Sequence, residues 1–201
     1  MTLPNIALLG RLRSGKDTVG DYLAEKYGYT RFAFGDELKR YAHELFGEPA
    51  PGTKPRALYQ TFGQACRTVE DGIWIRKCLA TIDWRAGDRA ACNASLREHA
   101  PHIPTAPFRA VVTDCRQLNE AEALAARSYV LIRVDAPDGL RIERAVNSGD
   151  TFEYAELFHG TETALDGYAA DFTVTNDAGL AELYAQIDEI MESLRSSSEA
   201  A

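Results

Sequence analysis

The stretch that decides the fold is Ile6-Ala-Leu-Leu-Gly10-Arg-Leu-Arg-Ser-Gly15-Lys16-Asp17-Thr18. It begins with an apolar run, as in a strand buried on both faces. A turn follows, with a glycine at each end, and the second glycine is followed by lysine. The spacing Gly-x4-Gly-Lys predicts a phosphate-binding loop, in which backbone N–H groups at a helix N-terminus surround phosphate oxygens. One position departs from the general pattern, because Asp17 stands where Ser or Thr is usual and Thr18 follows it.

The alternative is a plain connection between a strand and a helix, and the residues that follow count against it. Val19, Leu23 and Tyr27 recur at helical spacing, and Gly28 is suited to cap the helix. With strand and helix both in place, we expect Lys16 to lie against the β- and γ-phosphates of a nucleotide. The residues expected at the nucleotide are Gly10, Arg13, Ser14, Gly15, Lys16, Asp17 and Thr18.

Composition narrows the class of protein. The chain has 201 residues, of which 45% are hydrophobic and 26% charged, as in an ordinary globular domain with a substantial core. No apolar run approaches the length of a membrane span, and we expect a cytoplasmic protein without a membrane partner. The net charge of −8 argues against a nucleic acid polymer as partner but leaves a small nucleotide open. The four cysteines have no metal-ligand spacing, and we expect them to be reduced.

Apolar runs and amphipathic segments alternate along the chain. Strands are expected at about 5–9, 29–34, 108–113, 129–135 and 172–175, and helices at about 15–27, 36–46, 57–82, 88–98, 118–126, after Pro137 and over 180–194. This order predicts a P-loop NTPase fold of the α/β class, with a parallel five-stranded sheet between two layers of helices. We expect one domain over residues 1–201, with lid or acceptor insertions at about 48–105 and 137–168.

In such a sheet the ligand lies at the carboxyl ends of the strands, so the residues found there are candidates. Asp114 ends an apolar strand and could hold Mg²⁺ directly or through water, although a helix cap is the plain alternative. Arg116 could clamp a phosphate with two parallel hydrogen bonds, or be an ordinary surface arginine. Asp36 is expected to cap the next helix. Trp74 and Trp84 could stack on a base, but tryptophans at such positions are more often core residues.

Two arginines after Pro137 suggest a lid. Arg141 and Arg144 are three residues apart on the expected helix and therefore share a face. A lid of this kind would close over the transferring phosphoryl group, neutralise its charge and exclude water. The alternative is a pair of solvated arginines bound to Asp138 or Glu143.

The motifs together resemble one family. Gly10-Arg-Leu-Arg-Ser-Gly-Lys-Asp-Thr18 resembles the opening of the phage-type deoxynucleoside monophosphate kinases, in which Gly-Lys-Asp-Thr replaces Gly-Lys-Ser/Thr. Thr113-Asp-Cys-Arg-Gln-Leu-Asn-Glu120 resembles their Asp-Val-Arg-Phe-Pro-Asn-Glu. Weaker matches are Phe32-Ala-Phe-Gly-Asp-Glu-Leu-Lys39, Tyr59-Gln-Thr-Phe-Gly63 with Arg67 and Trp74 beyond it, and Ala170-Asp-Phe-Thr-Val-Thr-Asn176. The resemblance covers about residues 5–195, but Gly35-Asp36-Glu37 and Gln117-Leu118 depart from the family pattern, which leaves the acceptor open.

The resemblance implies transfer of the γ-phosphoryl group of ATP to a (deoxy)nucleoside monophosphate, with Mg²⁺ as cofactor, by a monomer or a homodimer. Its implied metal-site residues are Asp17, Thr18 and Asp114, and its implied catalytic residues are Lys16, Asp36, Arg116, Arg141 and Arg144. Asp36, Lys39, Gln60, Arg67, Arg116, Asn119 and Glu120 are the implied acceptor-binding residues. Two alternatives stay open: a P-loop kinase for dephospho-coenzyme A or phosphomevalonate, and a nucleotide-binding module that does not catalyse transfer.

Overall fold

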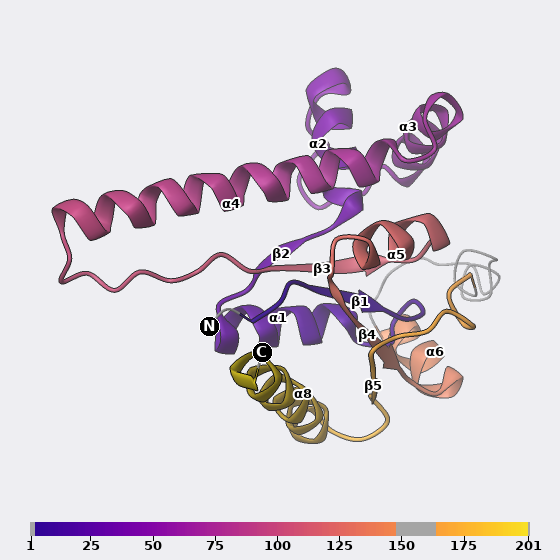
Figure 1. Cartoon of the computed structure of the whole chain (residues 1–201). Helices are drawn as coiled ribbons and strands as arrows, with labels where there is room; N and C mark the ends of the chain where they lie inside the picture. The colour runs from indigo at the N-terminus through magenta and orange to yellow at the C-terminus, as the bar shows by residue number, and fades with distance from the viewer. Residues whose placement is uncertain (1–2, 148–163, 201) are drawn as a thin grey trace. The chain divides into compact units, whose positions relative to one another are not determined.

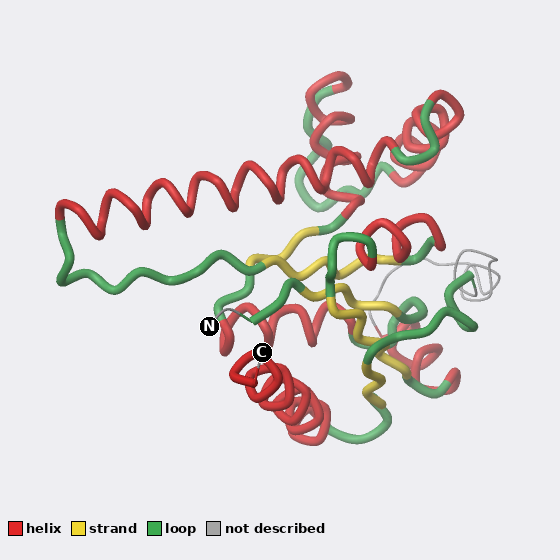
Figure 2. The backbone as a smooth tube through the Cα atoms, in the orientation of Figure 1, coloured by secondary structure: helices red, strands yellow, loops and turns green. Residues whose placement is uncertain are grey.

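The computed structural model describes residues 3–147 and 164–200. Strands and helices alternate over most of this length (Figures 1 and 2). The elements are β1 (Ile6–Leu9), α1 (Lys16–Tyr27), β2 (Thr30–Phe32), α2 (Phe34–Phe46), α3 (Arg56–Val69), α4 (Ile73–His99), β3 (Ala110–Cys115), α5 (Leu118–Ala125), β4 (Val130–Asp135), α6 (Asp138–Asn147), β5 (Phe172–Thr175) and α8 (Leu180–Ala200). All five predicted strands are present, within two residues of their predicted ends.

The strands form one sheet in the order β2-β3-β1-β4-β5. The central strand β1 pairs in parallel with β3 on one side and β4 on the other, and β4 pairs in parallel with β5. Consecutive β1 residues alternate between the two faces, and all four are buried. The predicted α/β fold with a parallel five-stranded sheet is therefore confirmed, and the carboxyl ends of β1, β3 and β4 meet where such folds bind their ligands.

The main core lies between the sheet and two helices. Figure 1 shows α1 and α8 together on one face of the sheet and α5 on the other. Val19 and Leu23 of α1 and Ile187 and Met191 of α8 are 0% exposed and pack in one cluster with Ile6 and its strand neighbours. Because this core fixes α1 beneath β1, the loop that joins them has two rigid ends.

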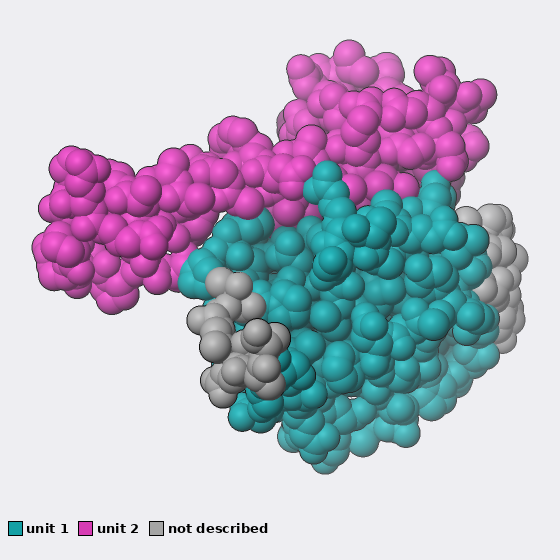
Figure 3. All heavy atoms as spheres, viewed as in Figure 1, with its two compact units in different colours: residues 1–31, 107–201 teal, residues 32–106 magenta. Residues whose placement is uncertain are grey.

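The chain forms two compact units, which Figure 3 colours separately. Unit 1 comprises residues 1–31 and 107–201 and holds most of the sheet; unit 2 comprises residues 32–106 and is almost entirely helical. The insertion predicted at about 48–105 lies within unit 2, whereas a single domain stays a prediction. Much of the insertion predicted at 137–168 lies outside the described residues.

Unit 2 differs from the sequence expectations in three ways. Helix α4 runs without a break from Ile73 to His99, because the alanines and arginines around Gly87 favour a helix by more than one glycine weakens it. Helix α2 begins at Phe34 with Ala33 as N-cap, so Asp36 does not cap it but lies in its first turn, where the helix dipole favours a carboxylate. Trp74 is a core residue at 3% exposure, as expected, but Trp84 is 64% exposed.

None of the helices in the described part of the chain combines the length and the apolar character that a bilayer span requires.

Candidate functional site

The loop from Gly10 to Lys16 has a backbone that other residues could not easily adopt. Gly10 has a φ of 140° and Gly15 a φ of 108°, both in the region that favours glycine. A Cβ atom at Gly10 would collide with the carbonyl oxygen of Val134, and one at Gly15 with the side-chain amide of Asn176. Arg13 has a φ of 63° although it carries a side chain, a conformation that costs about 1–2 kcal/mol. Both glycines are therefore required by the local geometry.

The lysine of this loop is buried against it. Lys16 is the first residue of α1 and is 6% exposed. Its ammonium group donates to the carbonyl oxygens of Gly10 at 2.6 Å and Arg11 at 2.8 Å. The charge of Lys16 is thus fixed at the mouth of the loop.

The next three carbonyl groups are bound by side chains from distant parts of unit 1. The Arg141 Nε atom donates to the carbonyl of Leu12 at 2.8 Å, and an Arg144 nitrogen lies 3.4 Å from that of Arg13. Asn176, directly after β5, donates through Nδ2 to the carbonyl of Ser14 at 2.8 Å. Arg144 also donates to the side-chain and backbone oxygens of Asn176, each at 3.1 Å. The two predicted arginines do share a face, and that face contacts the loop.

These contacts orient the whole loop. Every carbonyl group from Gly10 to Gly15 accepts a hydrogen bond, the last from the backbone N–H of Val19 at 3.0 Å. In a trans peptide the N–H group points away from the carbonyl of the same peptide unit, so each bound carbonyl also sets the direction of the N–H that follows it, and the N–H of Ser14 donates to the carbonyl of Arg11 at 3.2 Å within the loop. Bound carbonyl groups, two glycines of positive φ and a helix N-terminus are features that an anion-binding nest requires. Asn176 was not predicted as a site residue; the only signal for it was its place at the end of the segment Ala170–Asn176.

A pocket of about 290 Å³ opens beside the loop. Its lining residues are Gly15, Thr18, Arg144, Asn176, Ala178, Gly179 and Leu180. The chain thus places Thr18 on the side of the loop that faces the turn between β5 and α8. A planar group in this pocket would have the Arg144 guanidinium beside it, an arrangement suited to stacking.

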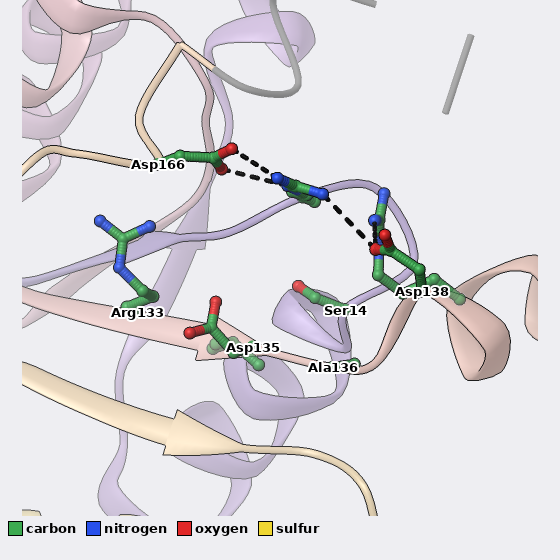
Figure 4. A pocket seen from close by; sticks show the side chains of 9 residues that line it. Ser14, Arg133, Asp135, Ala136, Asp138 and Asp166 are labelled. Carbon is green, nitrogen blue, oxygen red and sulfur yellow. Dashed lines mark hydrogen bonds and ion pairs between the residues drawn. The ribbon is translucent and has the colours of Figure 1, made fainter. Parts of the chain in front are cut away.

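A second pocket, of about 300 Å³, is lined by Arg11 and Ser14 of the loop and by residues at the end of β4 (Figure 4). Arg11 donates to Asp166 at 3.1 and 2.5 Å and lies 3.4 Å from Asp138. Arg133 donates to the backbone carbonyls of Leu165 and Tyr168. Arg11 holds the pKa of the Asp166 carboxyl below its usual range, although burial works against the ionised form. The charges lining this pocket are largely matched among themselves.

The end of β3 lies next to the start of the loop. Leu9 pairs with Cys115, so Asp114 comes one residue before the point where the chain leaves β1 for Gly10. Burial raises the pKa of the Cys115 thiol, the carboxylates of Glu120 and Asp114 raise it further, and Lys16 lowers it. Asp114 and Lys16 are therefore both close enough to act on one buried group.

The side chain of Glu120 caps the start of helix α5. It is 5% exposed, and its Oε2 atom accepts from the backbone N–H groups of Arg116 at 2.8 Å and Gln117 at 3.0 Å. This capping box at the start of α5 fixes the direction of the chain at Arg116. Asn119, the neighbour of Glu120, is half-buried in the same helix turn. A direct role of either side chain in acceptor binding stays a prediction.

Asp17 has a basic partner. Its side chain is 85% exposed and binds Arg31 at 2.7 Å, and Arg31 also pairs with Asp21 one turn further along α1. Gly20 leaves room for this guanidinium, because a Cβ atom there would lie 3.1 Å from the Arg31 Nε atom. Arg31 was not predicted as a site residue. Among the described residues no cluster of three or more His, Cys, Asp or Glu side chains could hold a metal ion.

The remaining predicted site residues belong to unit 2. Asp36 and Lys39 lie on α2 and pair at 3.1 Å, with side chains 64% and 50% exposed. Gln60 and Arg67 lie on α3 on either side of Gly63, which packs against Leu38 of α2. Seven residues make two helical turns, so Gln60 and Arg67 share one face of α3. Their action on an acceptor stays a prediction.

Known proteins resemble the chain in sequence and in fold. No family model matches it. A protein of Acanthamoeba polyphaga mimivirus named "Putative deoxynucleotide monophosphate kinase" is 28% identical over 203 residues, which cover 90% of this chain and 93% of the viral protein. Among solved structures, a gluconokinase from Sinorhizobium meliloti matches with a TM-score of 0.52 at 17% identity, over 97% of each chain. A shikimate kinase from Acinetobacter baumannii matches with a TM-score of 0.50 at 20% identity, over 98% of this chain and 95% of the enzyme. The chain therefore has the P-loop kinase fold, and the resemblance to the deoxynucleoside monophosphate kinases that its motifs predict is confirmed.

Proposed function

We propose that the protein transfers the γ-phosphoryl group of ATP to a (deoxy)nucleoside monophosphate and releases the two diphosphates. The observation that carries the proposal is the loop from Gly10 to Lys16, which combines two glycines of positive φ, a hydrogen bond to every carbonyl group from Gly10 to Gly15, and a lysine held against the loop. The mimivirus protein supports a monophosphate as acceptor through its name. The fold alone admits other acceptors.

The donor nucleotide fits the loop and the pocket next to it. The loop N–H groups and Lys16 would bind the β- and γ-phosphates, and Thr18 would lie nearer the α-phosphate. The pocket of about 290 Å³ between Arg144 and Gly179 would take the base and ribose. Arg144 would stack on the base and, through Asn176, keep the loop in place at the same time.

The residues at the end of β3 fit a magnesium ion. Asp114 is half-buried beside the loop, and its carboxylate is the type of ligand that Mg²⁺ prefers. When bound, the ion neutralises charge on the phosphate oxygens. Asp17 would act through water, if at all, because Arg31 already binds its carboxylate.

The acceptor phosphate would be bound by arginines and would not need a strong general base. Its phosphate is already ionised and needs no proton removed, so catalysis rests on alignment and charge neutralisation. Arg116 would hold the acceptor phosphate from unit 1, with its backbone fixed by Glu120. Asp36, Lys39, Gln60 and Arg67 of unit 2 stay candidates for acceptor binding.

The test is ADP release measured over a panel of acceptors. The panel contains the four deoxynucleoside monophosphates, the four ribonucleoside monophosphates, dephospho-coenzyme A and phosphomevalonate, each with ATP and Mg²⁺. We expect turnover of at least one monophosphate more than a hundredfold above the rate without acceptor. Turnover of dephospho-coenzyme A or phosphomevalonate alone would assign another acceptor. ATP binding with no acceptor-dependent turnover would leave a nucleotide-binding module.

A further inference from the structure

We propose that Arg141 is a positioning residue, which holds the phosphate loop in its binding shape through the carbonyl group of Leu12. The inference rests on the proposed function, because it assumes that the loop binds a nucleotide. It gives Arg141 a different task from an arginine that closes over the transferring phosphoryl group.

The first argument is burial. Arg141 is 2% exposed and is the largest fully buried side chain in the described part of the chain. A guanidinium group is costly to bury unless its charge and its donors are satisfied. Arg141 has both kinds of partner: Asp138 accepts from Nη1 at 2.6 Å, and the carbonyl of Leu12 accepts from Nε at 2.8 Å. The side chain is committed to these contacts and would have to break them to reach a phosphate.

The second argument is the peptide that Arg141 binds. The carbonyl of Leu12 and the N–H of Arg13 belong to one planar trans peptide, so a bond that pulls the carbonyl outward turns this N–H toward the loop centre. Arg13 is also the loop residue with a side chain and a positive φ, at 63°. Such a conformation persists where the surroundings enforce it. The Arg141 contact is placed where the loop most needs an external restraint.

The third argument is that Arg141 and its acidic partner lie on the same helix. Arg141 lies on α6, and Asp138 lies three residues before it in the first turn of the same helix, so the pair is set by the helix itself. By contrast, the Arg11 side chain on the loop is 31% exposed and lies 3.4 Å from Asp138. The Asp138 carboxylate is 53% exposed in both pairs, so the difference lies on the arginine side, where the buried Arg141 guanidinium has a single geometry and the more exposed Arg11 contact holds little.

The experiment compares Arg141→Met, which keeps the bulk and removes the donors, with Arg141→Lys, which keeps the charge. Glu143→Gln, an exposed position on the same helix, is the matched control. We measure the ADP dissociation constant by calorimetry with Mg²⁺, and kcat and the ATP KM with the best acceptor of the panel. Hydrogen exchange of the peptide covering residues 10–16, without nucleotide, reports the loop directly.

For Arg141→Met we expect the ADP dissociation constant and the ATP KM to rise at least tenfold, kcat to stay within about threefold, and exchange over residues 10–16 to accelerate. Arg141→Lys should recover part of the affinity, and Glu143→Gln should match the wild type. If Arg141→Met does not fold, Asp138→Asn takes its place, with an expected three- to tenfold loss of ADP affinity and faster exchange.

A large fall in kcat with unchanged ADP affinity and unchanged loop exchange would overturn the proposal, and would indicate that Arg141 acts on the transferring group. Wild-type affinity in every variant would overturn the positioning role and leave the proposed function intact. A wild-type protein that binds no ADP would overturn the proposed function, and this inference with it.

Discussion

The phosphate loop in unit 1 and the candidate acceptor residues in unit 2 are built in opposite ways. Around the loop, side chains from α1, α6 and the end of β5 bind consecutive carbonyl groups, and Lys16 and Arg141 are nearly inaccessible to solvent. On α2, Asp36 and Lys39 are at least half exposed and pair within one helix turn. The loop is a backbone site made rigid by its surroundings; the acceptor candidates are side chains on helix surfaces.

The contrast teaches where specificity can vary. A phosphate group is the same in every nucleotide, and a preorganised nest binds it without having to order the chain first. An acceptor differs from one enzyme to the next, and exposed helix positions can change without disturbing a core. Of the two departures from the family pattern, Gly35-Asp36-Glu37 falls in this second region, and Gln117-Leu118 falls in unit 1 at the start of α5.

Among the substitutions that test this difference between the two regions, the one at Lys16 is expected to have the largest effect. Lys16→Ala should lower turnover by on the order of 10²–10³-fold, as the loss of one charged donor in a shielded site does. Because Lys16 is buried and binds two carbonyl groups, the variant should also unfold more easily, so the thermal midpoint is measured with the activity. Glu25→Gln, at an exposed position of the same helix, is the control. Wild-type turnover of Lys16→Ala at saturating ATP would contradict the proposed donor site.

The next effect concerns the metal. Asp114→Asn should raise the Mg²⁺ concentration needed for half-maximal rate more than Asp17→Asn does, because Asp17 is bound to Arg31. We expect a shift of about tenfold for Asp114 and less than threefold for Asp17, from magnesium titrations at fixed ATP. A larger shift at Asp17 would place the ion at the start of α1 instead.

The acceptor side is tested by Arg67→Ala and Arg116→Ala. Each should raise the acceptor KM or lower turnover by about ten- to a hundredfold, because each removes a charge-assisted contact to a phosphate, while the ATP KM changes little. Arg76→Ala in unit 2 is the control, since Arg76 is exposed and pairs with Glu70. Equal losses in ATP affinity would move these arginines to the donor side.

The smallest expected effect concerns the stability of the contact between α8 and α1. Asp188 on α8 accepts hydrogen bonds from Tyr22, Tyr27 and Lys26 of α1, which fastens α8 to the helix that begins the loop. Burial works against the ionised carboxylate, but these three donors outweigh it and hold the pKa of Asp188 below its usual range. A lowered pKa stabilises the fold above about pH 4, the ordinary value, and the effect is lost as the pH falls through the native pKa.

We therefore expect Asp188→Asn to lower the free energy of unfolding by at most about 1 kcal/mol at pH 7, because the pair is partly exposed and screened. The difference from the wild type should shrink at pH 3. Urea unfolding at both pH values measures it, with Glu189→Gln as the neighbouring control. A difference independent of pH would mean that the ionised carboxylate is not what stabilises the contact.

Much of the geometry of the candidate donor site was predictable because it depends on local sequence. The glycines at 10 and 15 serve backbone angles that nearby residues require, and Lys16 follows them at a fixed spacing. Apolar runs predicted β1, β3 and β4, because a parallel strand buried on both faces must be largely apolar, whereas the edge strands β2 and β5 are partly exposed and contain polar residues. Two predictions were wrong: Asp36 does not cap α2, and α4 does not break near Gly87. Both concern where a helix begins or ends.

The sequence by itself determined the phosphate-loop motif, the succession of strands and helices along the chain and the class of fold, since each depends on neighbours within a few residues. Only the tertiary structure decided what holds the loop. Asn176 lies 162 residues from Ser14 and Arg141 lies 129 residues from Leu12, and no periodicity or spacing connects them. The strand order β3-β1-β4-β5 brings them together, because it places the ends of β4 and β5 on one side of β1. Contacts between such distant residues follow from the packing of the sheet, and packing is a property of the whole chain.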